Sequence, residues 1–197
     1  MPKIVDKEQK KREIVFKALD VFSQSGFRDS NLQQIASKCG YSRTTLYNYF
    51  KNKEEIYYFA LDAAFSRIED ESKLIVASTS LSTEDKIKAV IKSVMMNIGA
   101  TDKSAALMVD FGLQIKTGNL RLRKKVQDSV VSLQNTLTSL LDEGKREGFY
   151  KPIDSQAIAS TLLALVQSFI VNSVLTGING MDVRMDSLTI VLNSLKL

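Results

Sequence analysis

Apolar side chains recur at helical spacing through most of this chain. Ile14, Ala18 and Phe22, for example, stand four residues apart and therefore share one face of a helix. No proline interrupts residues 3–151, and alternating strand patterns bounded by turn dipeptides are hard to find. The pattern predicts an all-α protein.

The periodic segments and the breaks between them predict about nine helices. They span residues 6–25, 31–38, 42–49, 52–77, 82–98, 103–116, 119–145, 154–176 and 182–196. The fourth would be roughly 35–40 Å long at 1.5 Å per residue, which is more than one short helix pair can cover. We therefore expect it to join an N-terminal domain, residues 1–50, to a second domain, residues 51–197.

The eighth predicted helix lies in a stretch, residues 155–181, that contains no charged side chain. A membrane span is the first interpretation to test, but the stretch holds many polar side chains and has no cluster of Lys and Arg at its ends. A helical wheel puts Ile158, Leu162, Val166, Phe169 and Ile170 on one side and Ser160, Ala164, Gln167, Ser168 and Val171 on the other. The pattern predicts a helix covered by its own core on one face and by a partner subunit on the other, outside any membrane.

The composition excludes most kinds of enzyme. Among 197 residues there is no His and a single Cys, so His-dependent triads, HExxH zinc sites and CxxC ligation are unavailable. Phosphate-binding and nucleophile-elbow motifs are also missing. We therefore expect no enzyme, no metal and no cofactor. The polar N-terminus is unlike a signal peptide, and the lack of disulfides suits the cytoplasm.

Residues 32–51 fit the framework of a helix-turn-helix. Gly40 stands at the turn, where a positive φ is needed, and Ala36 at the close approach of the two helices, where only a small side chain fits. The framework positions expected to be buried carry Ile35, Cys39, Tyr41, Leu46 and Tyr49. Since Cys39 is one of them, we interpret it as a small buried apolar residue rather than a redox sensor.

The second helix of this unit has an outward face with side chains that read DNA. With Leu46 and Tyr49 inward, the i+3 and i+4 relations leave Arg43, Thr44, Tyr47 and Asn48 outward. Arg binds guanine in a bidentate manner and Asn binds adenine likewise, while the Thr methyl can meet a thymine methyl and Tyr can reach phosphate.

Other polar side chains around this unit complete the expected DNA contacts. Ser42 would cap the second helix, and lysines just beyond it would neutralise phosphates. Residues 1–60 also hold 11 Lys and Arg against 7 Asp and Glu, and so carry most of the formal charge of +5. The additional candidates are Ser30, Asn31, Ser42, Thr45, Tyr49, Lys51 and Lys53.

The same segment resembles the TetR (tetracycline-repressor-like) family of transcriptional regulators. The resemblance covers residues 10–60 and centres on Leu46-Tyr47-x-x-Phe50-x-x-Lys53-Glu54. A weaker similarity lies in residues 143–150, which match a Gly-rich turn that many members have before their last two helices. The chain departs from the family at Ser30-Asn31, where Thr-Thr is common, and at Tyr49, where His is common.

The resemblance implies a homodimer that binds a palindromic operator in double-stranded DNA. The dimer would form through the last two helices, residues 154–176 and 182–196. A C-terminal pocket would take a small-molecule effector whose binding releases the DNA, so that a bacterial repressor is the default expectation.

The effector and its contacts are only broadly indicated by the sequence. Apolar helices with few polar groups suit a small, largely apolar or amphipathic ligand, although any one of these Met and Phe side chains is more often part of an ordinary core. An alternative is a DNA-binding dimer controlled by a protein partner or without any small ligand. The candidate ligand contacts are Met95, Met96, Met108, Phe111, Gln114, Gln134 and Gln167.

Overall fold

The computed structural model describes residues 7–98, 120–176 and 180–197, and these residues form helices with one isolated β-bridge. The all-α prediction is confirmed, and the expected helix over residues 103–116 lies outside the described residues. The helices are α1 (Lys7–Asp29), α2 (Leu32–Cys39), α3 (Arg43–Tyr47), α4 (Lys53–Ala77), α5 (Thr83–Ile98), α7 (Leu120–Arg146), α8 (Ser155–Thr176) and α9 (Met181–Ser194).

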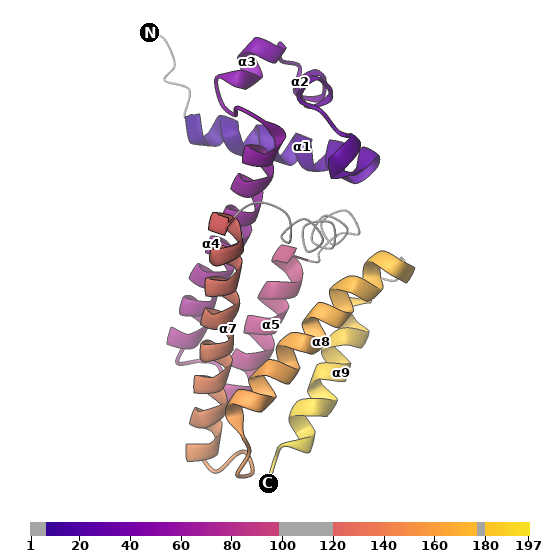
Figure 1. Cartoon of the computed structure of the whole chain (residues 1–197). Helices are drawn as coiled ribbons and strands as arrows, with labels where there is room; N and C mark the ends of the chain where they lie inside the picture. Colours follow the sequence, from indigo (N-terminus) through magenta and orange to yellow (C-terminus); the bar gives the residue numbers. More distant parts are fainter. Residues whose placement is uncertain (1–6, 99–119, 177–179) are drawn as a thin grey trace.

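Helices α1, α2 and α3 lie together at one end of the molecule, and we call them the head (Figure 1). The predicted stripe of Ile14, Ala18 and Phe22 is fully buried on α1. Gly26 has φ +75° and ψ 155°, so the helix breaks there as predicted, before a last turn that ends at Asp29. This kink turns the chain toward α2.

Helix α4 runs from the head down into the remaining helices, which we call the body (Figure 1). Asn52 caps its N-terminus, accepting a hydrogen bond from the backbone N–H of Glu55 at 2.8 Å. The helix contacts α1 as well as α5 and α7, and buries Ile56, Phe65 and Ile68. At 25 residues it is about 37 Å long, in line with the length expected from the sequence.

The body packs apolar stripes of its helices against one another. Helix α7 contributes Leu133, Leu137 and Leu140, which recur at helical spacing, and α5 contributes Ile87 and Ile91. Helix α5 contacts α4, α7, α8 and α9 and is thus central to this packing. Burial of side chains of this size stabilises the fold by about 1.5–3 kcal/mol each.

The two faces of α8 divide largely as the sequence predicts, although Ile158 and Phe169 of the predicted core face are only half-buried. Leu162, Val166 and Ile170 are buried against the body. The opposite set is exposed and consists of Ser160, Ala164, Gln167, Ser168 and Val171. By length and composition alone, residues 155–173 are apolar enough to cross a membrane, but a helix that buries one face in a protein core passes the same test.

The turn between α7 and α8 is held against the end of the chain. The backbone N–H of Lys151 donates to the carbonyl of Leu195 at 2.9 Å, and that of Leu197 to the carbonyl of Phe149 at 3.3 Å. Lys196 Nζ also pairs with Glu84 on α5 at 2.7 Å. These contacts fix α9 relative to α5 and to the α7–α8 turn.

Gly144 lies close to the ring of Tyr150 in this turn. A Cβ at Gly144 would lie 2.5 Å from the Tyr150 ring, so only glycine fits there. The Tyr150 hydroxyl is buried without a hydrogen-bond partner among the described residues. Burial, together with the nearby carboxylates of Glu84 and Glu147, raises the pKa of Tyr150 to about 12.

Candidate nucleic-acid interface

Local hydrogen bonds define both ends of α2. The side chain of Asn31 accepts from the backbone N–H of Gln34 at 3.0 Å, and the Gln34 side chain accepts from the N–H of Asn31 at 2.8 Å. This reciprocal capping box fixes where α2 begins. At the other end Gly40 is left-handed, with φ 72° and ψ 26°, and ends the helix.

The buried framework of the helix-turn-helix agrees with the prediction in part. Ile35, Ala36 and Leu46 are fully buried and lock α2, α3 and α1 together. Cys39, Tyr41 and Tyr49 are only half-buried. The two tyrosines were expected to be buried. They are only partly so because the ring packs on the core while the phenol oxygen stays in contact with water.

The half-buried Cys39 thiol lies in an environment that disfavours its ionised form. Burial raises the pKa of the Cys39 thiol, and the charge of Lys17 lowers it by a smaller amount. A thiol held protonated is a poor nucleophile and a poor target for oxidation. The geometry therefore agrees with a packing role for Cys39.

The outward face of α3 is formed by the four side chains that the sequence places there. Arg43, Thr44, Tyr47 and Asn48 are all exposed, while Leu46 on the same helix is fully buried. Arg43 Nη2 donates to the Tyr47 hydroxyl at 3.1 Å, and the guanidinium lies 5.5 Å from the centroid of the Tyr47 ring. This contact orders the Arg43 side chain on the free protein and leaves four of its five N–H donors for a partner.

Ser42 and Thr45 form a small hydrogen-bonded pair at the start of α3. Ser42 Oγ accepts from the backbone N–H of Thr45 at 3.0 Å and lies 2.8 Å from Thr45 Oγ1. Ser42 therefore acts as the N-cap that the sequence predicts. Ser42 is exposed and Thr45 is half-buried.

Two of the side chains predicted to touch DNA are engaged inside the protein instead. Ser30 is 4% exposed and its hydroxyl donates to the carbonyl of Phe27 at 2.7 Å. Lys53 Nζ donates to three carbonyl oxygens, those of Phe27 at 2.6 Å, Arg28 at 2.7 Å and Ser30 at 2.8 Å.

The prediction that these two side chains face DNA is therefore corrected. The Ser30 hydroxyl is covered by protein, and all three N–H donors of the Lys53 ammonium are used. Lys53 satisfies carbonyls that the end of α1 leaves without helical partners, and so joins α4 to α1. Only the position of the α1 end in space could reveal this role, because the two segments are 23 or more residues apart.

The predicted ligand contacts are not gathered at one place among the described residues. Met95 is buried in the body, whereas Met96, the next residue on α5, is 54% exposed. Gln134 on α7 donates to Ser160 on α8 at 2.8 Å. Gln167 is exposed on α8. The remaining candidates, Met108, Phe111 and Gln114, lie outside the described residues.

Polar groups that the sequence did not single out meet between α4 and α5. Glu71 accepts from Ser93 and, at 3.1 Å, from Asn97 and from Arg67. Donation from Ser93 is the main cause that lowers the pKa of Glu71. These contacts fix the lower half of α4 in the body.

Comparisons with known proteins agree with the geometry of the head. Residues 14–58 match the family model described as bacterial regulatory proteins of the tetR family. The fatty acid metabolism regulator protein of Bacillus subtilis (strain 168) is 27% identical over 175 residues, which are 84% of this chain and 86% of that protein.

Solved structures share the fold of the whole chain. A TetR transcription regulator from Haloarcula marismortui ATCC 43049 superposes with a TM-score of 0.81 at 14% identity, over 96% of this chain and 100% of the other. The regulator FadR from Bacillus subtilis, solved in complex with stearoyl-CoA, superposes with a TM-score of 0.69 at 22% identity, over 92% and 95% of the two chains.

Three observations point to the same family. They are the exposed recognition face on a capped helix-turn-helix, the match to the tetR family over the same residues, and the helical body. None of the related proteins compared above is described as an enzyme. The chain therefore belongs to the TetR family of DNA-binding transcriptional regulators.

Proposed function

We propose that this protein is a homodimeric bacterial repressor that binds a palindromic operator and leaves it when a small amphipathic ligand binds the body. Residues 1–50 would form the DNA-binding domain and residues 51–197 the ligand-sensing and dimerisation domain, in the cytoplasm. The observation that carries the proposal is the ordered, exposed set of side chains on α3, joined to the body by the continuous helix α4.

Base reading would be divided among the outward side chains of α3. Arg43 is suited to guanine because its guanidinium is already oriented by Tyr47 and keeps a bidentate pair of donors. Asn48 and Thr44 suit adenine and the thymine methyl. Asn31, Ser42, Thr45 and Tyr49 border this face and would contact phosphates, which set the position of the protein on the duplex.

Dimerisation would use α8 and α9, residues 154–176 and 182–196. The exposed face of α8 has no charged residue, and α9 exposes Val183 and Ile190 by 69% and 70%. Removing such an uncharged surface from water costs little desolvation free energy, which suits a subunit interface. Two copies related by a two-fold axis would present their α3 helices to successive major grooves about 34 Å apart.

The effector would bind among the body helices, and the relatives indicate its chemical class. One relative is named for fatty acid metabolism, and another was solved with stearoyl-CoA. We therefore propose a long-chain acyl thioester or a similar amphipathic acyl compound. Met95 and Gln134 remain contact candidates with Met96, Met108, Phe111 and Gln114, whereas Gln167 fits the dimer face better than a pocket.

The direct test is selection of bound sequences from random duplex DNA by the full chain. A two-fold symmetric consensus is expected, and an asymmetric or absent consensus would contradict the proposed operator. Arg43→Ala should relax discrimination at one base pair of each half-site by about 1–3 kcal/mol. Arg12→Ala, which removes the same charge from an exposed position on α1, should keep the consensus.

Ligand control is tested on the selected operator. Stearoyl-CoA should lower operator affinity at least tenfold, equivalent to about 1.4 kcal/mol of coupling, and coenzyme A without the acyl chain should not. An operator affinity unchanged by stearoyl-CoA would contradict acyl control and favour a protein partner. Light scattering that gives a monomer would contradict the dimer.

A further inference from the structure

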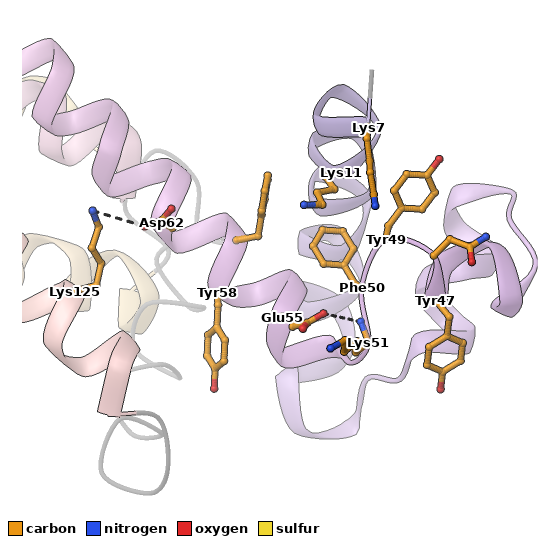
Figure 2. A pocket seen from close by; sticks show the side chains of 12 residues that line it. Lys7, Lys11, Tyr47, Tyr49, Phe50, Lys51, Glu55, Tyr58, Asp62 and Lys125 are labelled. Atoms are coloured by element: carbon orange, nitrogen blue, oxygen red, sulfur yellow. Dashed lines mark hydrogen bonds and ion pairs between the residues drawn. The ribbon is translucent and has the colours of Figure 1, made fainter. Parts of the chain in front are cut away.

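A groove lies where the head meets the body. Its volume is about 560 Å³, within the 300–1,000 Å³ typical of small-molecule sites. Three separate parts of the chain line it, namely the start of α1, the α3–α4 connection with the first turns of α4, and the start of α7 (Figure 2). A molecule bound there would touch the head and the body at once.

The groove carries more positive than negative charge. Lysines 7, 11, 51 and 125 line it together with two carboxylates, Glu55 and Asp62. Both carboxylates are already engaged within the groove. Glu55 accepts the backbone N–H of Lys51 at 2.7 Å, and Asp62 pairs with Lys125 at 3.7 Å.

The four lysines still outnumber the two carboxylates, so the groove keeps a formal charge of +2. Lys11 pairs with Glu8 at 3.0 Å, but that pair stays at the surface of α1, where such pairs are weak. Lys7 precedes Lys11 by one helical turn and lies on the same face. Lys51 is exposed and has no side-chain partner among the described residues. An anion in the groove would gain charge-assisted hydrogen bonds from these groups.

Aromatic rings form the remaining wall of the groove. Tyr49, Phe50, Tyr58 and Phe59 line it, and the rings of Phe50 and Phe59 pack edge to face at 5.8 Å. Figure 2 shows Lys7, Lys11 and Tyr49 gathered around Phe50, with Tyr58 farther along α4. A flat ring system finds an apolar surface here beside the ammonium groups.

We propose that this groove is a second effector site, which binds a small organic phosphate carrying a flat ring. The phosphate would lie among Lys7, Lys11 and Lys51, and the ring against the aromatic wall. This groove is separate from the site proposed for the acyl ligand in the body. The organic phosphate would bind the groove whether or not the acyl ligand is bound. A free phosphate ion offers the same charge, but it lacks a ring to use the aromatic wall.

Occupancy of the groove would reach the DNA-reading face directly. Tyr47 and Asn48 line the groove and also belong to the outward face of α3. Tyr47 in turn holds Arg43 through its hydroxyl at 3.1 Å. A ligand that repositions Tyr47 therefore changes the orientation of Arg43, and by linkage the ligand and the operator alter each other's affinity equally.

The test uses calorimetric titration of the full chain with three probes, namely AMP, adenosine and inorganic phosphate. AMP should bind with one site per chain, and adenosine and inorganic phosphate should bind at least tenfold more weakly. Equal binding of adenosine would overturn the role of the lysines, and equal binding of inorganic phosphate would overturn the role of the rings. No saturable binding of AMP would overturn the site.

Variants then place the site on the protein. The double variant Lys7→Gln and Lys11→Gln should lower AMP affinity at least tenfold. Lys17→Gln, which removes the same charge from an exposed position farther along α1, should leave it within twofold. Circular dichroism should show all variants folded, since none of the three side chains is buried. Equal AMP affinity in the double variant would overturn the assignment of these lysines.

Measurements of operator binding show whether the groove is a ligand site or a surface that contacts DNA phosphates. AMP should weaken operator binding by the wild type and have no effect on the double variant. A double variant that loses operator affinity while the wild type never binds AMP would show that the lysines serve DNA alone and overturn the proposal. The selected operator sequence is measured without AMP, so it tests the proposed function separately.

Discussion

Replacing Lys53 by methionine is the sharpest test of how the head is joined to α4. The change keeps most of the side-chain length but removes an ammonium that donates three hydrogen bonds of 2.6–2.8 Å to the end of α1. It also removes a cation held 4.7 Å from the centroid of the Phe27 ring. Three carbonyl oxygens would then be left to water or unsatisfied.

The expected cost follows from these contacts. A hydrogen bond to a charged group contributes about 1.5–3 kcal/mol, and three such bonds would give more than any single residue normally supplies. The full sum is not expected, because the three hydrogen bonds share one ammonium and Lys53 is only half-buried. In the variant, water can donate hydrogen bonds to some of the three carbonyl oxygens. We expect Lys53→Met to lower the free energy of unfolding by about 2–4 kcal/mol, a large share of the 5–15 kcal/mol typical of whole proteins.

The assay is urea unfolding followed by far-ultraviolet circular dichroism at one protein concentration. Lys51→Met is the matched control, since Lys51 is exposed two residues earlier and should change stability by less than about 0.5 kcal/mol. The salt dependence of operator binding should be unchanged in folded Lys53→Met. Unchanged stability together with a salt slope reduced by about 0.9 would refute the structural role and restore Lys53 as a phosphate contact.

Three further predictions concern the turn between α7 and α8 and its contacts. Gly144→Ala should destabilise the protein by about 1–3 kcal/mol in urea unfolding, because its Cβ would meet the Tyr150 ring at 2.5 Å, and an unchanged midpoint would argue against that contact. Tyr150→Phe should be neutral or stabilising by up to about 1 kcal/mol, because it removes a buried hydroxyl that has no partner among the described residues, whereas a clear loss of stability would imply such a partner. Burial opposes ionisation of Glu84, but hydrogen bonds from Lys196 and Lys88 outweigh burial and lower the pKa of the Glu84 carboxyl. The ionised carboxyl therefore stabilises the folded protein fully above the ordinary pKa of 4.5. This stabilisation is lost as the pH falls through the lower pKa of the folded state. Glu84→Gln should therefore cost about 1–3 kcal/mol at neutral pH and flatten the acid limb of the stability profile, and an identical acid limb in both proteins would contradict the assignment.

Local sequence signals were sufficient for the helices and for the outward face of α3. Asn31, Gly40, Ser42 and Asn52 each define a helix end through contacts within a few residues, so their roles follow from the sequence alone. The period of α8 likewise predicted which face packs on the body, because that depends on helix geometry, but not that Ile158 and Phe169 on this face would be only half-buried.

Contacts between distant segments could not be predicted in this way. Lys53 stands in a family motif and beside the recognition helix, which suggested DNA, but its partners lie at the end of α1. Gly144 sits in a segment typical of a turn, and only the folded position of Tyr150 shows that close packing requires it. Lys7 and Lys11 were not singled out from the sequence, because only the fold places the aromatic rings of α4 beside them.

The continuity of α4 also makes it a lever. Over a length of about 37 Å, a tilt of about 5° at its body end displaces its head end by about 3 Å. The displacement is transmitted only if the helix is rigid. A flexible point anywhere between the body and Lys53 would therefore reduce the displacement of the head end of α4. Under the proposed ligand control, Ala63→Gly at this exposed position of α4 should therefore weaken the coupling between effector and operator while leaving the side chains of both sites unchanged.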